Sequence, residues 1–207
     1  MTEPLFSHSW STASPYALAL VLAAILCVVL AFLGWRRRAM PGGVQFAAMM
    51  AAAAVWALFY ALELVAPSLG GKVLWAKAEY IGIVPLPLAW YLFARAHTGA
   101  AKKLNRGFLA VLGVVAIVTL VLVATNDWHG LVWSRTSLSA SDSMPLLVLA
   151  HGLWFWVHAA YCYILLALGS LLLLSAVQIV FFLAVGKFAF GVNLGLSYLQ
   201  QGREVSP

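Results

Sequence analysis

Long apolar runs separated by short polar segments make up most of the chain. A run of about 20 apolar residues is what one membrane-spanning helix requires, and residues 16–35 form the first such run. The stretch from 145 to 201 is apolar throughout and is too long for one span, so we expect it to divide near Ser175 to Gln178. The predicted spans are 16–35, 44–65, 73–96, 108–124, 146–174 and 178–200, between an outer N-terminal segment, 1–15, and a C-terminal tail, 202–207. The pattern therefore predicts an all-α, polytopic transmembrane helical bundle of about six spans.

Two apolar runs, the third and the last, contain residues that complicate a simple layout of six straight spans. Pro85 and Pro87 lie within the third run and predict a kink there, because proline cannot donate a helical hydrogen bond. The expected turn near Ser175 has no charged residue to hold it on one side of a membrane. A layout of five spans, with a re-entrant last segment, is the alternative.

Composition and charge support a membrane protein and give it an orientation. The chain is 64% hydrophobic, whereas soluble domains contain roughly 45–50% apolar residues. Basic residues cluster after the first and third runs, at Arg36 to Arg38 and from Arg95 to Arg106. Because basic loops stay on the cytoplasmic side, we expect a protein of the bacterial inner membrane with its N-terminus outside. The basic residues flank spans and form no soluble patch, so nucleic-acid binding is not expected.

The segment from Trp56 to Trp133 contains residues that are individually common but distinctive in their order. They are Trp56, Glu63, Lys72, Trp75, Tyr80, Gly82, Pro85, Trp90, His97, Thr98, Gly99, Thr125, Asn126, His129 and Trp133. In this order the sequence resembles the N-terminal seven-span sensor region of bacterial and archaeal histidine kinases. Gln178 and Asn193 are looser matches to a Gln and an Asn of that family's sixth span.

The resemblance covers about half of the chain and implies a sensor fold. It does not extend to kinase activity, because the sequence shows no phosphoacceptor-histidine helix, no ATP-binding domain and no seventh span. The basic residues usual between the family's fifth and sixth spans are also missing. We therefore expect a sensory or ligand-binding module that is not an enzyme and passes its output to another protein.

The outer halves of the predicted spans contain the best candidate binding site. Ionisable groups inside a membrane are costly and usually pair or face a cavity. We therefore predict an outward pocket for a small ligand, with tryptophan walls from Trp75, Trp128, Trp133 and Trp154. The candidate ligand-binding residues are Glu63, Lys77, Glu79, His129, Trp133 and His151. The alternative is an interfacial aromatic belt with structural ion pairs, such as one between Glu63 and Lys77.

Two histidines in the predicted fifth span are weaker candidates for a metal or pigment. His151 and His158 are seven residues apart, so on a helix they share a face and stand ~10 Å apart along the axis. Either imidazole could contact haem or the magnesium of a (bacterio)chlorophyll, although the sequence requires no cofactor. A buried histidine with a local hydrogen bond is the alternative. Cys27 and Cys162 lie in apolar runs and indicate neither a disulfide nor a metal site.

The last predicted span contains features of helix packing, and these support a second class of function. Lys187 lies near its middle, and Gly191 and Gly195 form a GxxxG pattern that permits close helix contact. We expect the lipid bilayer and other membrane subunits as partners. The alternative to a sensor is a non-catalytic accessory subunit of a respiratory or photosynthetic complex, in contact with pigment or lipid. An intramembrane enzyme or transporter is a third class, but the sequence contains no motif for either.

Overall fold

The protein folds into a helical bundle with one small β-hairpin. The computed structural model describes residues 5–99, 105–139 and 145–204, with the backbone alone for 5–14, 106 and 179–204. Its elements are α1 (Leu5–Arg36), α2 (Gly43–Val65), α3 (Leu69–Ile83), α4 (Pro85–His97), α5 (Arg106–Ala124), α6 (Asn126–His129), β1 (Trp133–Leu138), β2 (Leu147–His151) and α7 (Leu153–Glu204). The predicted helical membrane bundle is confirmed.

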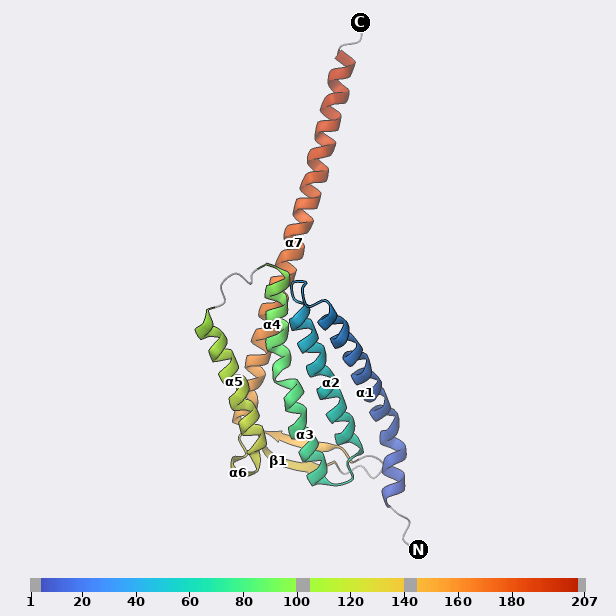
Figure 1. Ribbon diagram of the computed structural model, residues 1–207, viewed down its shortest axis with the longest axis vertical. Coiled ribbons are helices and arrows are strands. Elements are labelled where there is room, and N and C mark those ends of the chain that lie inside the picture. Colours follow the sequence, from blue (N-terminus) through green and yellow to red (C-terminus); the bar gives the residue numbers. More distant parts are fainter. Residues whose placement is uncertain (1–4, 100–104, 140–144, 205–207) are drawn as a thin grey trace.

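The helices run up and down between two ends that differ in composition (Figure 1). One end, called here the hairpin end, contains the α2–α3 connection, α6 and the two strands. The other, called the arginine end, contains the α1–α2 turn, residues 37–42, and the C-terminus of α4. Helix α1 packs on α2, α2 packs on α3 and α4, and α4 packs on α7.

Four helical segments among the described residues are long and apolar enough to cross a membrane: 15–36, 43–65, 107–124 and 153–178. The predicted spans at 16–35, 44–65 and 108–124 therefore correspond to helices of the structure. The third predicted span is divided, as its prolines indicated: α3 ends at Ile83 and α4 begins at Pro85. Val84 between them keeps a helical conformation, so α3 and α4 together make one further pass across the bundle.

Helices α2 and α3 approach each other closely because their facing residues are small. Ala52 and Ala61 of α2 and Ala76 of α3 are all buried. A Cβ atom on Gly82 would lie 2.6 Å from the backbone nitrogen of Trp56, so only glycine fits at this contact. This close packing positions the charged residues of both helices at the hairpin end.

The end of the chain differs from the sequence-based prediction. Residues 147–151, expected to begin the fifth span at 146, form a strand, and α7 then runs unbroken through the predicted turn at 175–178. The proposed division into spans 146–174 and 178–200 is therefore wrong. The segment contains no proline to stop a helix, and the Ser175 hydroxyl donates to the Leu171 carbonyl at 2.8 Å, which satisfies it within the helix. The C-terminal half of α7 extends past the arginine end (Figure 1).

The hairpin packs onto the bundle through a small apolar core. β1 and β2 pair antiparallel, with Thr136 opposite Leu149 and a bulge between Trp133 and Arg135. Trp133 is buried and packs edge-on against Tyr80 of α3, with ring centroids 5.7 Å apart. Val123 of α5 and Val132 belong to the same core cluster. The strands are therefore fixed to both α3 and α5.

Candidate functional site

The hairpin end carries a hollow between α3, α6 and β1, with apolar side chains of α3 on one side (Leu69, Val73 and Leu74) and polar groups of α6 and β1 on the other. It consists of two adjoining pockets of about 410 and 300 Å³, and Asp127 and Thr136 line both. Lys77 lines the first pocket, while His129, Trp133 and Arg135 line the second. Three of the predicted ligand-binding residues, Lys77, His129 and Trp133, thus lie around this hollow.

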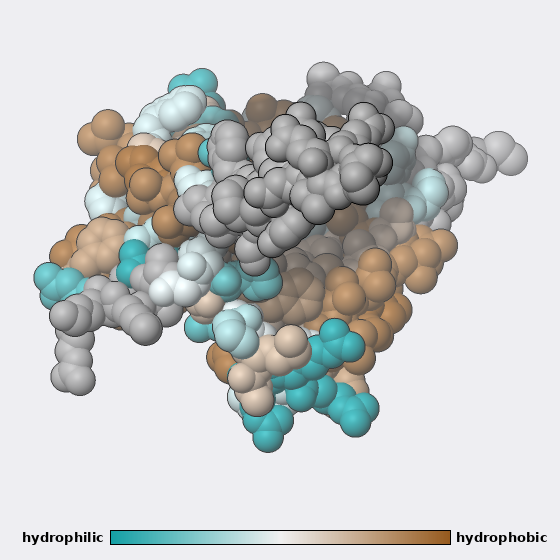
Figure 2. Space-filling view, turned by 90° about the horizontal axis from the view of Figure 1, so that it is seen from above, coloured by the Kyte–Doolittle hydropathy of each residue, from teal (hydrophilic) through white to brown (hydrophobic). Residues whose placement is uncertain are grey.

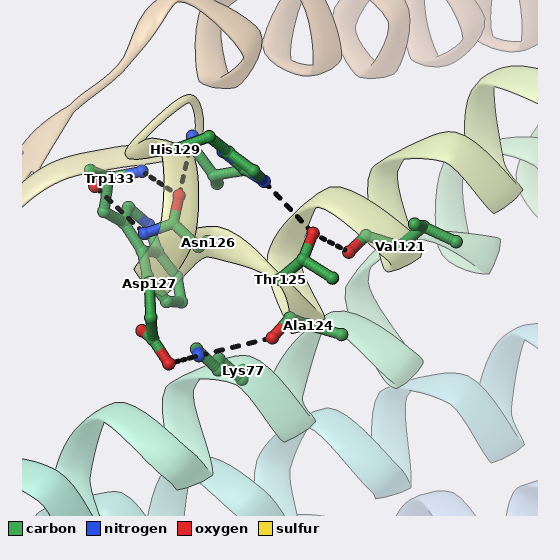
Figure 3. Close-up of polar contacts among 9 residues, drawn as sticks. Lys77, Val121, Ala124, Thr125, Asn126, Asp127, His129 and Trp133 are labelled. Carbon is green, nitrogen blue, oxygen red and sulfur yellow. Dashed lines mark hydrogen bonds and ion pairs between the residues drawn. The ribbon is translucent and has the colours of Figure 1, made fainter.

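The charged pair in the hollow is Lys77 and Asp127. The Lys77 ammonium group lies 2.7 Å from a carboxylate oxygen of Asp127 and 3.4 Å from the carbonyl oxygen of Ala124 (Figure 3). The Asp127 side chain is 70% exposed. Because Lys77 pairs with Asp127, the Glu63–Lys77 ion pair that was named as part of the alternative is not formed. The pair thus places a half-buried ammonium group beside a largely exposed carboxylate at the hollow.

Asn126 fixes the backbone that forms the floor of the hollow. Its side-chain oxygen accepts hydrogen bonds from the backbone N–H groups of Val132 and Trp133, and its amide nitrogen donates to the Trp133 carbonyl (Figure 3). The side chain is 5% exposed, so these bonds are shielded from water. Asn126 appeared in the sequence only as a family-motif match, and its structural role was missed.

The exposed His129 closes the turn beside Asn126. One ring nitrogen lies 3.1 Å from the Thr125 hydroxyl oxygen, and the other accepts the Leu131 N–H at 3.0 Å. The two bonds orient the ring along the rim of the hollow. Trp128 is 87% exposed on the same rim. Of the other two tryptophans expected to form walls, Trp75 stacks on Phe59 and Trp154 donates to the Thr119 hydroxyl, and neither lines the hollow.

Glu63 and Glu79 lie away from the hollow, in a buried cluster between α2 and α3. Each is 8% exposed. One oxygen of Glu79 accepts the Trp56 indole N–H at 3.2 Å, and the other has no donor among the described residues. The predicted single pocket containing these acids and His129 is therefore not formed.

Lys72 is the most buried ionisable residue of this region, with 2% of its surface exposed. Its ammonium group donates to the carbonyl oxygens of Glu63 at 2.8 Å and Leu64 at 3.0 Å. These carbonyls belong to the last turn of α2, where a helix lacks its own donors and its dipole favours a cation. Lys72 thus caps α2 from α3. The sequence showed Lys72 only as a motif residue, because nothing local reveals its contact.

The two histidines of the predicted fifth span lie in different settings. His151 ends β2, is exposed, and packs against Phe155 at a centroid distance of 3.7 Å. It does not share a helix face with His158, so that expectation is wrong. His158 is buried in α7 beside Tyr80 and Tyr161, and its ring lies 3.5 Å from the Cys162 sulfur. No group of three or more histidine, cysteine or acidic residues in the described chain could hold a metal ion.

The predicted packing residues of the last span, Lys187, Gly191 and Gly195, lie in the C-terminal half of α7. Their side chains are outside the described residues. Their role in packing stays a prediction.

The fold and the site define a multi-pass membrane protein with a polar surface at one end and a projecting helix at the other. Residues 19–187 match the family described as the N-terminal 7TM region of histidine kinase. The chain belongs to this family, and the resemblance found in the sequence is confirmed. No curated protein and no solved structure matches the chain. The family supports a membrane sensory module, and nothing in the comparisons supports the accessory-subunit alternative.

Proposed function

We propose that the protein senses a small polar ligand in the hollow at the hairpin end and passes the signal to the arginine end through α7. The observation that carries this proposal is the continuity of the chain from the hairpin into α7. β2 ends at His151 and α7 begins at Leu153. The helix then continues for 52 residues, about 78 Å at ~1.5 Å per residue, whereas the hydrocarbon core of a bilayer is ≈ 30 Å thick.

The distribution of charge supports an orientation with the hairpin end outside the inner membrane. The described charged side chains at the arginine end, Arg36, Arg37, Arg38 and Arg95, are all basic. The acids whose side chains are described, Glu63, Glu79 and Asp127, belong to elements that approach the hairpin end. Because basic residues are retained on the cytoplasmic side, the hollow would face outward and α7 would project inward. The N-terminus would then lie outside, as expected from the sequence.

The hollow suits a zwitterionic or anionic small molecule. Lys77 and Asp127 supply opposite charges on one side, and Arg135 and His129 supply further polar contacts on the other. A ligand that separates Lys77 from Asp127 would move α3 relative to α6. Since Asn126 and Trp133 tie α6 to β1, and β1 pairs with β2, the movement would reach the start of α7.

The coupling can be tested by spin labels at the arginine end of the full chain. We would replace the native cysteines Cys27 and Cys162 by alanine and place labels at Met40 and Val177, both more than 60% exposed. Distances between the labels would be measured in nanodiscs. Asn126→Ala, which frees the hairpin backbone, should shift or broaden the distance distribution.

Arg135→Gln provides the control, because this exposed side chain lines the hollow without fixing the backbone. It should leave the label distances unchanged. Circular dichroism would verify that both variants keep their helical content. An Asn126→Ala protein that is folded and shows the wild-type distance distribution would contradict signal passage through α7.

A further inference from the structure

A second pocket lies at the arginine end, far from the hollow. It has a volume of about 360 Å³ and is formed by the end of α1, the α1–α2 turn, Phe46 of α2 and the last turns of α4. Arg37 and His97 are its ionisable lining residues, and no acidic residue lines it. His97 stacks on Phe93 at a centroid distance of 5.6 Å, which orients its ring at the wall of the pocket. The pocket therefore combines an apolar wall with two nitrogen donors.

The three consecutive arginines of the turn differ in what their guanidinium groups contact. Arg36 lies over the Phe32 ring at 5.9 Å, and Arg38 lies over the Trp35 ring at 5.6 Å. Arg38 also contacts the Trp35 carbonyl oxygen at 3.5 Å. The exposed Arg37 guanidinium has no hydrogen-bond, ion-pair or ring partner within the described part of the chain. Arg37 is thus the arginine of the turn that is available to an anion.

An apolar track leads from this pocket along α1. Leu26, Leu30 and Leu33 are spaced by four and three residues, so they share one face of the helix. Leu30 and Leu33 line the pocket, and Leu26 is 58% exposed one turn further along. Seen from the arginine end, hydrophilic surface borders directly on hydrophobic surface (Figure 2).

We propose that this pocket binds the phosphodiester headgroup of an anionic phospholipid, with Arg37 and His97 as donors and an acyl chain along the Leu26–Leu33 face of α1. An arginine at the membrane boundary, above an exposed apolar helix face, provides the charge and the apolar contact that such a lipid requires. A free phosphate would use the donors but not the leucine face. This lipid site is separate from the hollow at the hairpin end. Its test therefore gives the same answer whether or not the hollow binds a ligand.

The test is lipid binding to the full chain in neutral detergent, measured by native mass spectrometry. Phosphatidylglycerol is the anionic probe and phosphatidylcholine, which has no net charge, is its counterpart. We expect one tightly bound phosphatidylglycerol. Arg37→Gln should weaken its binding about tenfold, since a hydrogen bond to a charged group contributes roughly that factor. The neighbouring variants Arg36→Gln and Arg38→Gln remove the same charge and should change binding less than about twofold, because their guanidinium groups do not line the pocket.

Leu33→Trp is a second variant that leaves all charges in place. It should also weaken phosphatidylglycerol binding, because the larger side chain fills the pocket. Equal losses in the three arginine variants would overturn the proposal in favour of a diffuse basic surface. Equal binding of the two lipids would overturn it as well. Displacement of the lipid by excess inorganic phosphate would identify a phosphate site in place of a lipid site.

Discussion

Two lysines on α3, five residues apart, have opposite structural roles. Lys72 is 2% exposed and donates to two carbonyls of α2, whereas the Lys77 side chain is 16% exposed and pairs with the exposed Asp127. The same contrast holds on α6, where Asn126 is buried and Asp127 faces water. Five residues correspond to a rotation of about 140° around a helix, which separates the two lysines. The buried Lys72 and Asn126 hold elements together, and the half-buried Lys77 and the exposed Asp127 line the hollow.

Of the substitutions that test this contrast, one at Lys72 should cause the largest loss of stability. Lys72→Met keeps the length of the side chain but leaves the buried carbonyl of Leu64 without a donor, while the carbonyl of Glu63 keeps only the Ala66 N–H. A buried group without a partner costs about 1–3 kcal/mol, so we expect the free energy of unfolding to fall by about that amount. Reversible unfolding in mixed micelles would measure this change.

Lys77→Met is the matched control on the same helix and should lower the free energy of unfolding by less than about 1 kcal/mol. Similar losses of unfolding free energy in the two variants would show that the greater burial of Lys72 does not make it more important for stability than Lys77.

Asn126→Ala should produce the next largest effect. The substitution removes three shielded hydrogen bonds, each with a net contribution of about 1 kcal/mol, so the hairpin should lose about 2–3 kcal/mol of local stability. Hydrogen exchange at the Val132 and Trp133 amides reports this directly, and both should exchange faster. Ser134→Ala, which removes one exposed bond to Ala150, should leave their exchange nearly unchanged. Unaltered protection in Asn126→Ala would mean that β-pairing alone fixes this backbone.

The sequence predicted the features of the fold that depend on local composition. Hydropathy located α1, α2 and α5, and Pro85 marked the division between α3 and α4. The hairpin was missed because residues 147–151 lie within a long apolar run, and their strand partner is the distant segment 133–138. The continuity of α7 was missed because the apolar stretch 145–201 is longer than one span requires and was divided for that reason, although the Ser175 hydroxyl bonds within an unbroken helix.

The candidate site was predicted only in part, since its assembly depends on contacts between distant segments. Lys77, His129 and Trp133 do meet around one hollow. Nothing in the sequence shows that Lys77 pairs with Asp127, fifty residues away, in place of Glu63. The burial of Lys72 and Glu79 likewise follows from the close approach of α2 and α3 at Gly82, which is a property of the folded helices.

A smaller effect is expected at Glu79, whose buried carboxylate accepts the Trp56 indole N–H. Glu79→Leu leaves that donor without its partner, so the free energy of unfolding should fall by about 1 kcal/mol. Glu79→Gln keeps an acceptor for the indole N–H and removes a buried carboxylate, so its free energy of unfolding should be no lower than that of the wild type. Unfolding in mixed micelles compares the two variants. Equal losses would show that the hydrogen bond from Trp56 is not what stabilises this position.

The smallest effect on stability should come from the Lys77–Asp127 pair, in which the aspartate is exposed and the lysine half-buried. A double-mutant cycle with Lys77→Gln and Asp127→Asn isolates the interaction of the two charges from the other contacts of each side chain. We expect a coupling of about 0.2–1 kcal/mol, since Asp127 is largely solvated. In 1 M salt the Debye length falls to about 3 Å, and the coupling should nearly vanish. A coupling above 2 kcal/mol that resists salt would instead place the pair in the structural group with Lys72. A ligand could then not separate Lys77 from Asp127. The proposed movement of α3 relative to α6 on ligand binding would be contradicted.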